Sequence, residues 1–67
     1  MQITLSAARK NKGLKQKEAA KILGITEYTL SNYERGITAP DVHIVKKIEE
    51  LYGISYNDLN FLPKNNG

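Results

Sequence analysis

QKEAAKILGITEYTLSNYERG, the stretch of residues 16–36, has the pattern of two short helices joined by a tight turn. The first helix is predicted over residues 16–23, because apolar residues recur there at the three- and four-residue spacing of one helical face. These residues are Ala19, Ala20 and Leu23. Gly24 follows directly and is expected to end the helix, since glycine adopts the left-handed conformation without a Cβ clash.

A second helix is predicted over residues 27–35. Thr26 stands just before it, and a threonine hydroxyl can accept a hydrogen bond from the backbone N–H groups of the first turn. Leu30 is expected to point inward, and Gly36 closes the helix. Two helices joined by a short glycine-containing turn form the unit that DNA-binding proteins use to place a recognition helix in the major groove.

This order of residues resembles the helix-turn-helix of the Cro and phage-repressor family, known in bacteria as the XRE family. The matching residues are Gly13, Leu14, Gln16, Ala20, Gly24, Ile25, Thr26, Leu30, Ser31, Glu34, Arg35 and Gly36. The likeness continues through Pro40, residues 51–55 and Leu59. It implies an all-α fold, a compact five-helix domain of the lambda-repressor-like type. We expect this domain over residues 1–62, followed by a flexible C-terminal tail over residues 63–67.

Length and composition exclude several classes of protein. A chain of 67 residues forms one domain with one small core and has no room for a separate catalytic domain. It has no cysteine and one histidine, so we expect neither a disulfide, a zinc site nor another metal or cofactor. No nucleophile, base and orienting group stand together as in an enzyme. Without a long apolar run or a signal peptide, the protein is predicted to be cytoplasmic.

Positive charge is concentrated in the half that contains the predicted helix-turn-helix. Residues 1–36 carry seven lysines and arginines against three glutamates, whereas the remainder carries three lysines against four acidic residues. Cationic side chains that displace counterions supply most non-specific affinity for DNA. Lysines also simply solvate helix surfaces, so the charge by itself leaves both interpretations open. Together with the motif it favours DNA.

Candidate DNA-binding residues lie at the start and along the outer side of the second helix. Asn32 is suited to adenine, Glu27 to the cytosine amino group, and Tyr28 to a thymine methyl or a phosphate. Glu27 has an alternative role, which is to stabilise the helix N-terminus. For Gln16 the resemblance implies a phosphate contact and support of the recognition helix, and the alternative is a passive first-turn residue. The full set is Gln16, Lys17, Thr26, Glu27, Tyr28, Ser31, Asn32, Arg35 and Thr38.

Two further residues have roles outside base recognition. The resemblance implies that Arg9 pairs with Glu34 and so fixes the first helix against the recognition helix, although an exposed Arg9 that faces solvent or phosphate stays an alternative. Lys15 stands where the family usually has a serine or threonine cap. Lysine cannot accept a bond from the helix N-terminus, so this cap is predicted to be weak or missing, with the charge placed for a phosphate.

The rest of the chain supplies the remaining helices. The first is predicted over residues 4–12, with Leu5 and Ala8 facing the core. Asp41 is expected to cap a helix that ends at Gly53. The core face of that helix is assigned to Val42, Val45, Ile48 and Tyr52, with Leu51 beside them.

A short fifth helix is predicted over residues 56–61, because Ser55 and Asp58 have the spacing of a capping box. Leu59, Phe61 and Leu62 exceed what so short a segment needs for its own packing. The resemblance implies a small dimer contact in this region. The alternative, that all three residues close the core, stays equally open.

We therefore expect a sequence-specific, double-stranded DNA-binding transcriptional regulator, a repressor of phage, mobile-element or bacterial origin that binds a palindromic operator as a homodimer. No small-molecule ligand and no membrane partner are expected. Two alternatives stay open: an antitoxin-type regulator with a protein partner, and a helical protein-interaction module that has lost DNA binding. Glu27 and the loop of residues 36–40, which has no lysine or arginine, favour the last of these.

Overall fold

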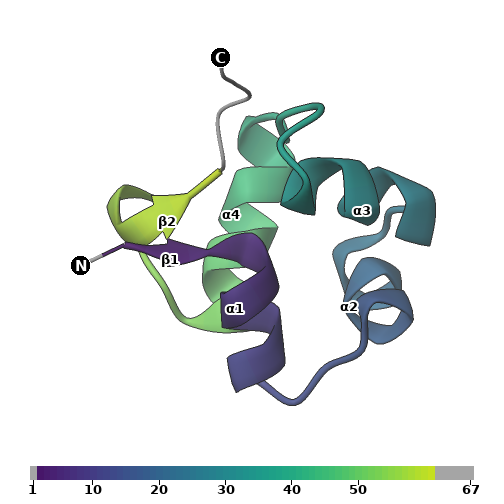
Figure 1. Ribbon diagram of the computed structural model, residues 1–67, viewed down its shortest axis with the longest axis horizontal. Coiled ribbons are helices and arrows are strands. Elements are labelled where there is room, and N and C mark those ends of the chain that lie inside the picture. Colours follow the sequence, from purple (N-terminus) through teal and green to yellow (C-terminus); the bar gives the residue numbers. More distant parts are fainter. Residues whose placement is uncertain (1, 62–67) are drawn as a thin grey trace.

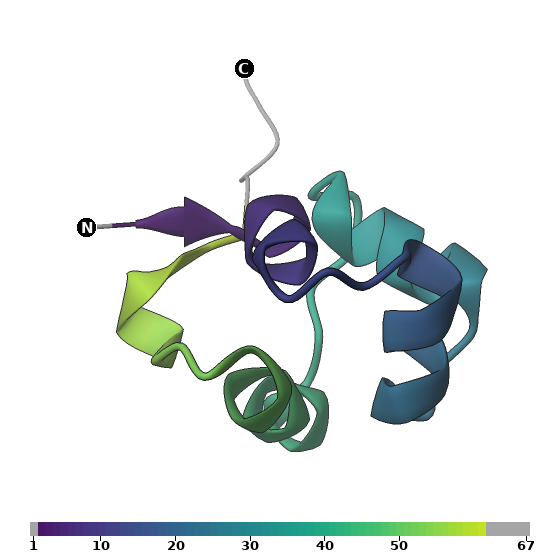
Figure 2. The same cartoon turned by 90° about the horizontal axis from the view of Figure 1, so that it is seen from below.

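The computed structural model describes residues 2–61 and contains four α-helices, a short 3-10 helix and two very short strands. In chain order these elements are β1 (Ile3–Thr4), α1 (Leu5–Asn11), α2 (Gln16–Leu23), α3 (Glu27–Glu34), α4 (Val42–Tyr52), η1 (Tyr56–Asp58) and β2 (Leu59–Asn60). Helices α1 and α4 form the centre, with α2 and α3 on one side and the strand pair with η1 on the other (Figure 1; Figure 2). The helix-turn-helix is therefore one flank of the domain.

Side-chain caps define where three of the helices begin. The hydroxyl of Thr4 accepts from the backbone N–H of Ala7 at 3.1 Å, and Asp41 accepts from the N–H of Ile44 at 3.0 Å. Helix α1 is one residue shorter at each end than predicted, because Thr4 is its N-cap and Lys12 is its C-cap. Helix α2 has its predicted bounds, and α3 ends one residue early, with Arg35 as its C-cap.

The core gathers apolar residues from all four helices and β2. Its fully or almost fully buried members are Leu5, Ala8, Ala19, Ala20, Leu23, Leu30, Ile48, Tyr52 and Leu59. The assignment of Val42 to the core is wrong, because its side chain is 68% exposed and Ile44 packs against the core instead. Val42 reaches Ile48 by two steps of three through Val45, whereas Ile44 precedes Ile48 by four residues, so local helical spacing allows either series. Only the rotation of α4 against the other helices distinguishes them.

The predicted fifth helix is also wrong. The chain makes one 3-10 turn over η1 and then pairs β2 with β1 in parallel, with Ile3 opposite Leu59 and Thr4 opposite Asn60. The described residues thus form a mostly helical fold with four α-helices, which fits the expected all-α class but not the expected count of five. The hydroxyl of Ser55 accepts from the N–H of Asn57 at 3.3 Å, in place of the predicted capping box. The strand pair joins the two ends of the described chain, so no local sequence pattern predicts it.

A contact from α4 fixes the start of η1. A carboxylate oxygen of Glu49 accepts a hydrogen bond from the backbone N–H of Tyr56 at 2.6 Å. This bond holds the turn after Gly53 close to the last turns of α4. Within residues 2–61, no helix combines the length and the apolar composition that crossing a bilayer requires.

Candidate nucleic-acid interface

The turn between α2 and α3 has a defined backbone conformation. Gly24 adopts φ 77°, in the left-handed region, and the N–H of Ile25 returns to the carbonyl of Ala20 at 3.0 Å. Thr26 then caps α3, as its hydroxyl accepts from the N–H of Thr29 at 3.0 Å and donates to the hydroxyl of Thr29 at 2.9 Å. Helix α3 therefore starts directly after the turn, in an orientation set by α2.

The inner face of α3 is held by a polar network around Glu34. Its side chain is 6% exposed and takes hydrogen bonds from Arg9 Nε to Oε2 at 2.7 Å and from Arg9 Nη2 to Oε1 at 3.2 Å. Gln16 Nε2 also donates to Oε1, at 3.0 Å. The hydrogen bond to Glu34 raises the pKa of Arg9. One carboxylate thus connects α1, the first residue of α2 and the last residue of α3.

Two more groups complete the surroundings of this network. Arg9 Nη1 donates to the carbonyl of Leu14 at 3.0 Å, which ties the α1–α2 connection to the same guanidinium. Burial, together with the charge of Glu34, raises the pKa of Tyr52 to about 12. The hydroxyl of Tyr52 is buried and has no hydrogen-bond partner among the described residues. This tyrosine is therefore kept in its neutral form beside the ion pair.

The outer face of α3 presents polar and aromatic side chains to solvent. Tyr28, Asn32 and Arg35 follow one another at four- and three-residue spacing, on the side of the helix opposite Leu30 and Glu34. Tyr28 is 74% exposed, and Arg35 is exposed. Arg35 Nη2 donates to Asn32 Oδ1 at 3.1 Å. This bond was not predicted, although the three-residue spacing between an arginine and an amide was a signal for it.

The other candidate residues surround this face. Lys17, Thr26, Glu27 and Thr38 are exposed, whereas Ser31 and Gln16 are half-buried. The side chain of Gln16 points to Glu34, so the structure places its amide in support of α3. The N–H of Thr38 lies 3.5 Å from the carbonyl of Asn32, which brings the loop after α3 close to the outer face.

Helix α2 begins without a side-chain cap from Lys15, as predicted. Glu18, which was not predicted to act here, satisfies this end instead. A carboxylate oxygen of Glu18 accepts from the backbone N–H of Lys15 at 2.8 Å, which is one half of a capping box. The signal was a glutamate three residues after the cap position. The side chain of Lys15 is exposed at this N-terminus.

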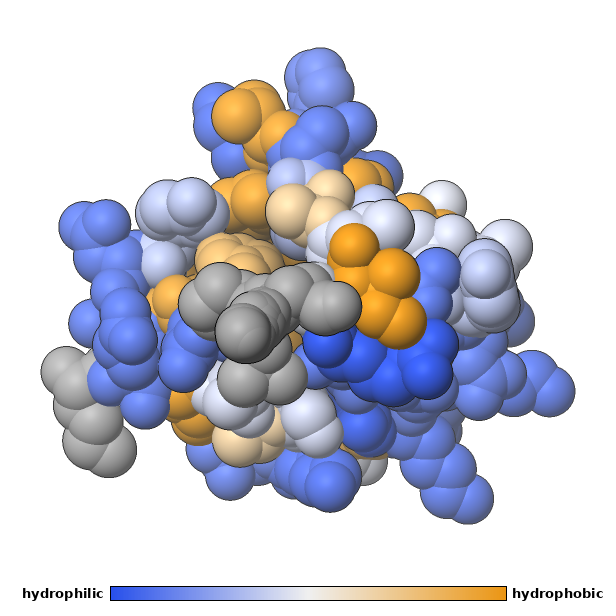
Figure 3. Space-filling view, turned by 45° about the horizontal axis from the view of Figure 1, so that its top comes forward, coloured by the Kyte–Doolittle hydropathy of each residue, from blue (hydrophilic) through white to orange (hydrophobic). Residues whose placement is uncertain are grey.

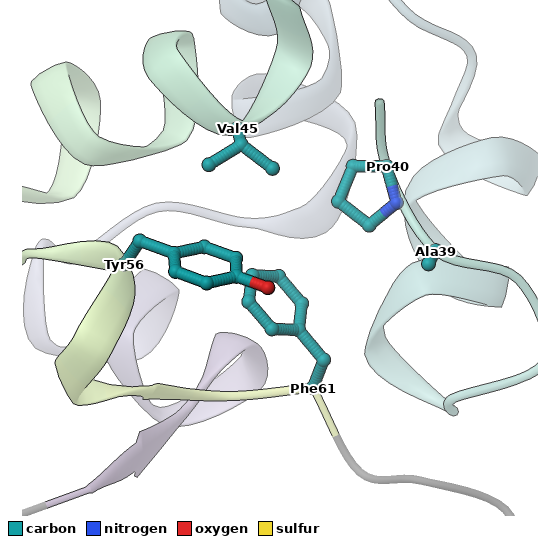
Figure 4. A pocket seen from close by; sticks show the side chains of 5 residues that line it. All are labelled: Ala39, Pro40, Val45, Tyr56 and Phe61. Atoms are coloured by element: carbon teal, nitrogen blue, oxygen red, sulfur yellow. The ribbon is translucent and has the colours of Figure 1, made fainter. Parts of the chain in front are cut away.

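An apolar hollow lies next to the loop that follows α3. It encloses about 110 Å³, and its lining consists of Ala39, Pro40, Val45, Tyr56 and Phe61 (Figure 4). The ring centroids of Tyr56 and Phe61 are 5.5 Å apart, and the two rings form one wall of the hollow. Three large apolar side chains of this region are exposed, namely Ile37, Val42 and Tyr56. On the face that carries the α3–α4 loop, apolar side chains surface among hydrophilic ones (Figure 3).

The three residues proposed for a dimer contact differ in position. Leu59 is 4% exposed and belongs to the core, which is the alternative that the sequence left open. Phe61 is half-buried and contacts the ring of Tyr56. Leu62, like the expected tail of residues 63–67, lies outside the described residues.

With this geometry in place, comparisons with known proteins give the family. The sequence model of the helix-turn-helix family matches residues 5–59. The chain belongs to this family. It is the XRE-type helix-turn-helix family that the order of residues in α2 and α3 indicated. No solved structure matches the chain significantly.

Curated relatives within the family are regulators of transcription. The HTH-type transcriptional regulator ImmR of Bacillus subtilis (strain 168) is 45% identical over 51 residues, which are 76% of this chain and 40% of ImmR. The HTH-type transcriptional regulator PuuR of Escherichia coli (strain K12) is 32% identical over 60 residues, which are 90% of this chain and 32% of PuuR. The chain thus spans less than half the length of these relatives.

Proposed function

We propose that this chain is a DNA-binding transcriptional regulator that reads double-stranded DNA with the outer face of α3. The observation that carries this proposal is the division of α3 into two faces. Glu34 is held inside by Arg9 and Gln16, which leaves Tyr28 and Asn32 directed outward. A recognition helix needs such a fixed orientation, because base contacts specify sequence only when the helix enters the groove in one register.

The proposed contacts follow from side-chain chemistry. Tyr28 and Asn32 read base edges, while Glu27 accepts from a cytosine amino group and Ser31 and Thr26 contact the groove wall. Cationic and polar groups bind phosphates on either side of the groove. These groups are Lys17, Arg35, Thr38 and the backbone of Gln16. Because Lys17 and Arg35 are exposed, each can displace counterions without a change in the core.

The proposed assembly is a homodimer on a palindromic operator. The apolar hollow and the exposed Ile37, Val42 and Tyr56 lie beside the loop that follows α3, so a second copy seated there places the two α3 helices on either side of a two-fold axis. The domain measures 31 × 26 × 22 Å, which is compatible with half-sites roughly 34–36 Å apart. Phe61, and Leu62 next to it, stay the proposed aromatic and apolar part of this contact.

The proposed outcome of binding is repression in a bacterial, phage or mobile-element setting, in the cytoplasm. A dimer on an operator that overlaps a promoter blocks polymerase by occupying the site. The relatives ImmR and PuuR are named as transcriptional regulators, which supports a role in regulation. No enzymatic activity is proposed.

Selection from random duplexes tests DNA recognition. The protein, Asn32→Ala and Tyr28→Ala are each incubated with a pool of random duplexes over a range of salt concentrations, and the retained DNA is sequenced. We expect the unaltered protein to select a motif and each variant to lose preference at a different position. Lys17→Ala and Lys46→Ala form a matched pair, since each removes one positive charge. Only Lys17→Ala is expected to reduce the slope of the logarithm of affinity against the logarithm of salt concentration, by about one. Salt-driven binding without a motif would overturn the proposal.

Dimer formation is tested with a pair of apolar surface residues. Val42 is 68% exposed beside the hollow, and Ile22 is 57% exposed on α2. We expect Val42→Glu to retain one half-site but to lose the inverted repeat, and Ile22→Glu to keep the repeat. Sedimentation of both variants with operator duplex gives the stoichiometry. Equal behaviour of the two variants would contradict the assigned face.

A second candidate function is a protein-interaction module, including an antitoxin with a protein partner. The exposed apolar group of Ile37, Val42 and Tyr56 beside the hollow is the observation that favours it. If the selection yields no motif, and a co-expressed partner copurifies with the protein but not with Val42→Glu, this candidate replaces DNA recognition.

A further inference from the structure

The proposal concerns the hydrogen bond between Arg35 and Asn32 on the outer face of α3. We infer that Arg35 is a positioning residue that holds the Asn32 amide with its NH₂ group directed outward, so that this amide recognises guanine. This inference rests on the proposed function, since it assigns a base preference to the same face. It replaces the adenine contact expected for Asn32 and adds a role to the phosphate contact expected for Arg35.

The chemistry of the pair identifies which amide atom Arg35 contacts. A guanidinium has only donors, so the atom 3.1 Å from Arg35 Nη2 is the carbonyl oxygen of Asn32 and not its nitrogen. The amide plane is thereby oriented, because Oδ1 and Nδ2 lie on opposite sides of the Cγ atom. With Oδ1 directed to Arg35, the two N–H groups of Nδ2 are directed away from it.

The backbone under both residues is fixed. The carbonyl of Asn32 accepts from the N–H of Ile37 at 2.9 Å, and the N–H of Arg35 donates to the carbonyl of Ser31 at 3.0 Å. Arg35 itself retains a helical conformation, with φ −89° and ψ −2°. The pair therefore stands on the last ordered turn of α3, and only the side-chain torsions of Arg35 and Asn32 need to be ordered for the bond to form.

The hydrogen bond between Arg35 and Asn32 leaves hydrogen-bond donors on the outer face of α3. After the bond is formed, Asn32 still has two N–H donors and Arg35 has four of the five that a guanidinium carries. Guanine presents two acceptors, N7 and O6, to the major groove, whereas adenine and cytosine each present an amino group there. A bidentate contact to adenine needs Oδ1 as the acceptor, and Arg35 already occupies one of the two lone pairs of Oδ1 and turns this oxygen toward itself. The donor surface therefore favours guanine.

The experiment separates positioning from a plain phosphate contact. Selection with Asn32→Ala first identifies the operator position at which this variant loses its base preference. We then measure relative affinities for four operator duplexes that differ only in the base at this position. The proteins compared are the unaltered protein, Arg35→Ala, Arg35→Lys and Lys17→Ala. We expect the unaltered protein to prefer guanine there by roughly tenfold, within the range for a good polar base contact. In Arg35→Ala this preference falls to about twofold or less, since Asn32 alone is free to turn.

The two cation variants supply the controls. Arg35→Lys keeps the charge, so it is expected to keep the salt slope while it loses most of the guanine preference, because lysine lacks the planar fork. Lys17→Ala is expected to reduce the salt slope by about one and leave the preference unchanged. In the double variant of Asn32→Ala with Arg35→Ala, the preference is expected to be no lower than in Asn32→Ala alone. Thermal melts establish that each variant is folded.

Three outcomes would overturn the inference in distinguishable ways. If Arg35→Ala weakens binding equally for all four bases, as Lys17→Ala does, Arg35 contacts phosphate only. If adenine is preferred at the Asn32 position, the amide is oriented the other way. If neither the unaltered protein nor Lys17→Ala selects any motif, the proposed function fails, and the inference fails with it.

Discussion

Glu34 and Arg35 are neighbours at the end of α3, yet they belong to opposite faces of that helix. Glu34 is buried, takes hydrogen bonds from Arg9 and Gln16 and connects three helices. Arg35 is exposed, and its guanidinium donates to Asn32 on the surface. The inner contact determines where α3 lies, and the outer contact determines what α3 presents. Stability and the proposed recognition of DNA thus depend on adjacent residues.

The two faces differ because water reaches the polar groups of the outer face but not those of the inner face. Inside, each polar group that loses its partner stays desolvated, so breaking the Arg9–Glu34 pair is costly. Outside, water replaces a lost partner, so the Arg35–Asn32 bond contributes little to folding. The two faces can therefore be altered independently, and the following predictions test this in order of decreasing effect on the free energy of unfolding.

The largest effect is expected for Glu34→Ala. This change leaves the half-buried Arg9 without its carboxylate and Gln16 without its acceptor, so the free energy of unfolding should fall by about 3 kcal/mol. A domain of this size has only roughly 3–10 kcal/mol in total, so a large unfolded fraction is expected. Urea unfolding followed by circular dichroism measures it. Glu27→Ala, on the exposed side of α3, is the control, with a change within about 0.5 kcal/mol. Similar losses in both would remove the distinction between the faces.

The next effect concerns Tyr52, which lies beside the inner network. Its pKa is raised to about 12 in the folded protein, against about 10 for an unperturbed tyrosine. The folded state thus holds this proton more tightly, so the related stability is complete below pH ~10 and is lost as the pH rises to about 12. The loss should be on the order of 2 kcal/mol. Tyr52→Phe is expected to abolish this part of the alkaline decline in melting experiments from pH 8 to 12.

The same variant also tests the unpartnered hydroxyl. At pH 7, Tyr52→Phe removes a buried polar atom that has no hydrogen bond, so stability should be equal or slightly higher. Tyr28→Phe is the matched control on the exposed outer face and should be as stable as the unaltered protein at pH 7. A marked loss of stability for Tyr52→Phe at pH 7 would mean that its hydroxyl has a partner in solution.

A smaller gain is expected for Lys15→Ser. Serine supplies the side-chain acceptor that lysine lacks, while Glu18 retains its bond to the backbone of residue 15. The domain should gain about 0.5–1 kcal/mol. Loss of the positive charge should also reduce the salt slope of DNA affinity by about one if this charge meets a phosphate. Lys15→Ala separates the two effects, because it removes the charge without adding an acceptor.

The smallest effect is expected for Asn32→Ala. Among residues 2–61 its amide bonds only to Arg35, on the exposed face, so the free energy of unfolding should change by less than about 0.5 kcal/mol. The backbone bonds from the following loop to the carbonyl of residue 32 are retained in this variant. A loss of more than 1 kcal/mol in the same urea experiment would show that the outer face also supports the fold.

Elements with local signals could be predicted closely. Helix α2 has its predicted bounds, because Gly24 and the apolar stripe before it are sufficient to define a helix and its end. Val42 was misplaced because helical periodicity also fits Ile44, and the choice depends on how α4 is rotated in the core. The cap by Glu18 had a local signal, a glutamate three residues after the cap position, that was overlooked.

The C-terminal segment could not be predicted in the same way. Residues 56–61 contain a capping pattern, which favoured a fifth helix, but pairing of β2 with β1 replaced it. That pairing depends on a strand at the other end of the described chain. Hydrogen bonds between residues so far apart in the sequence give rise to no periodic pattern in the sequence. Leu59 accordingly lies in the core, where the sequence allowed either the core or a dimer contact.

The sequence by itself determined the helix-turn-helix, the family and the basic character of the first half, because caps, a turn glycine and periodic apolar residues act over a few neighbouring positions. Only the tertiary structure decided which way α3 faces, that Gln16 joins the Arg9–Glu34 pair, and that Arg35 donates to Asn32. Helical spacing gives the relative angles of residues around an axis. The absolute rotation of that axis is set by packing, where the cost of an unpaired buried group selects one arrangement.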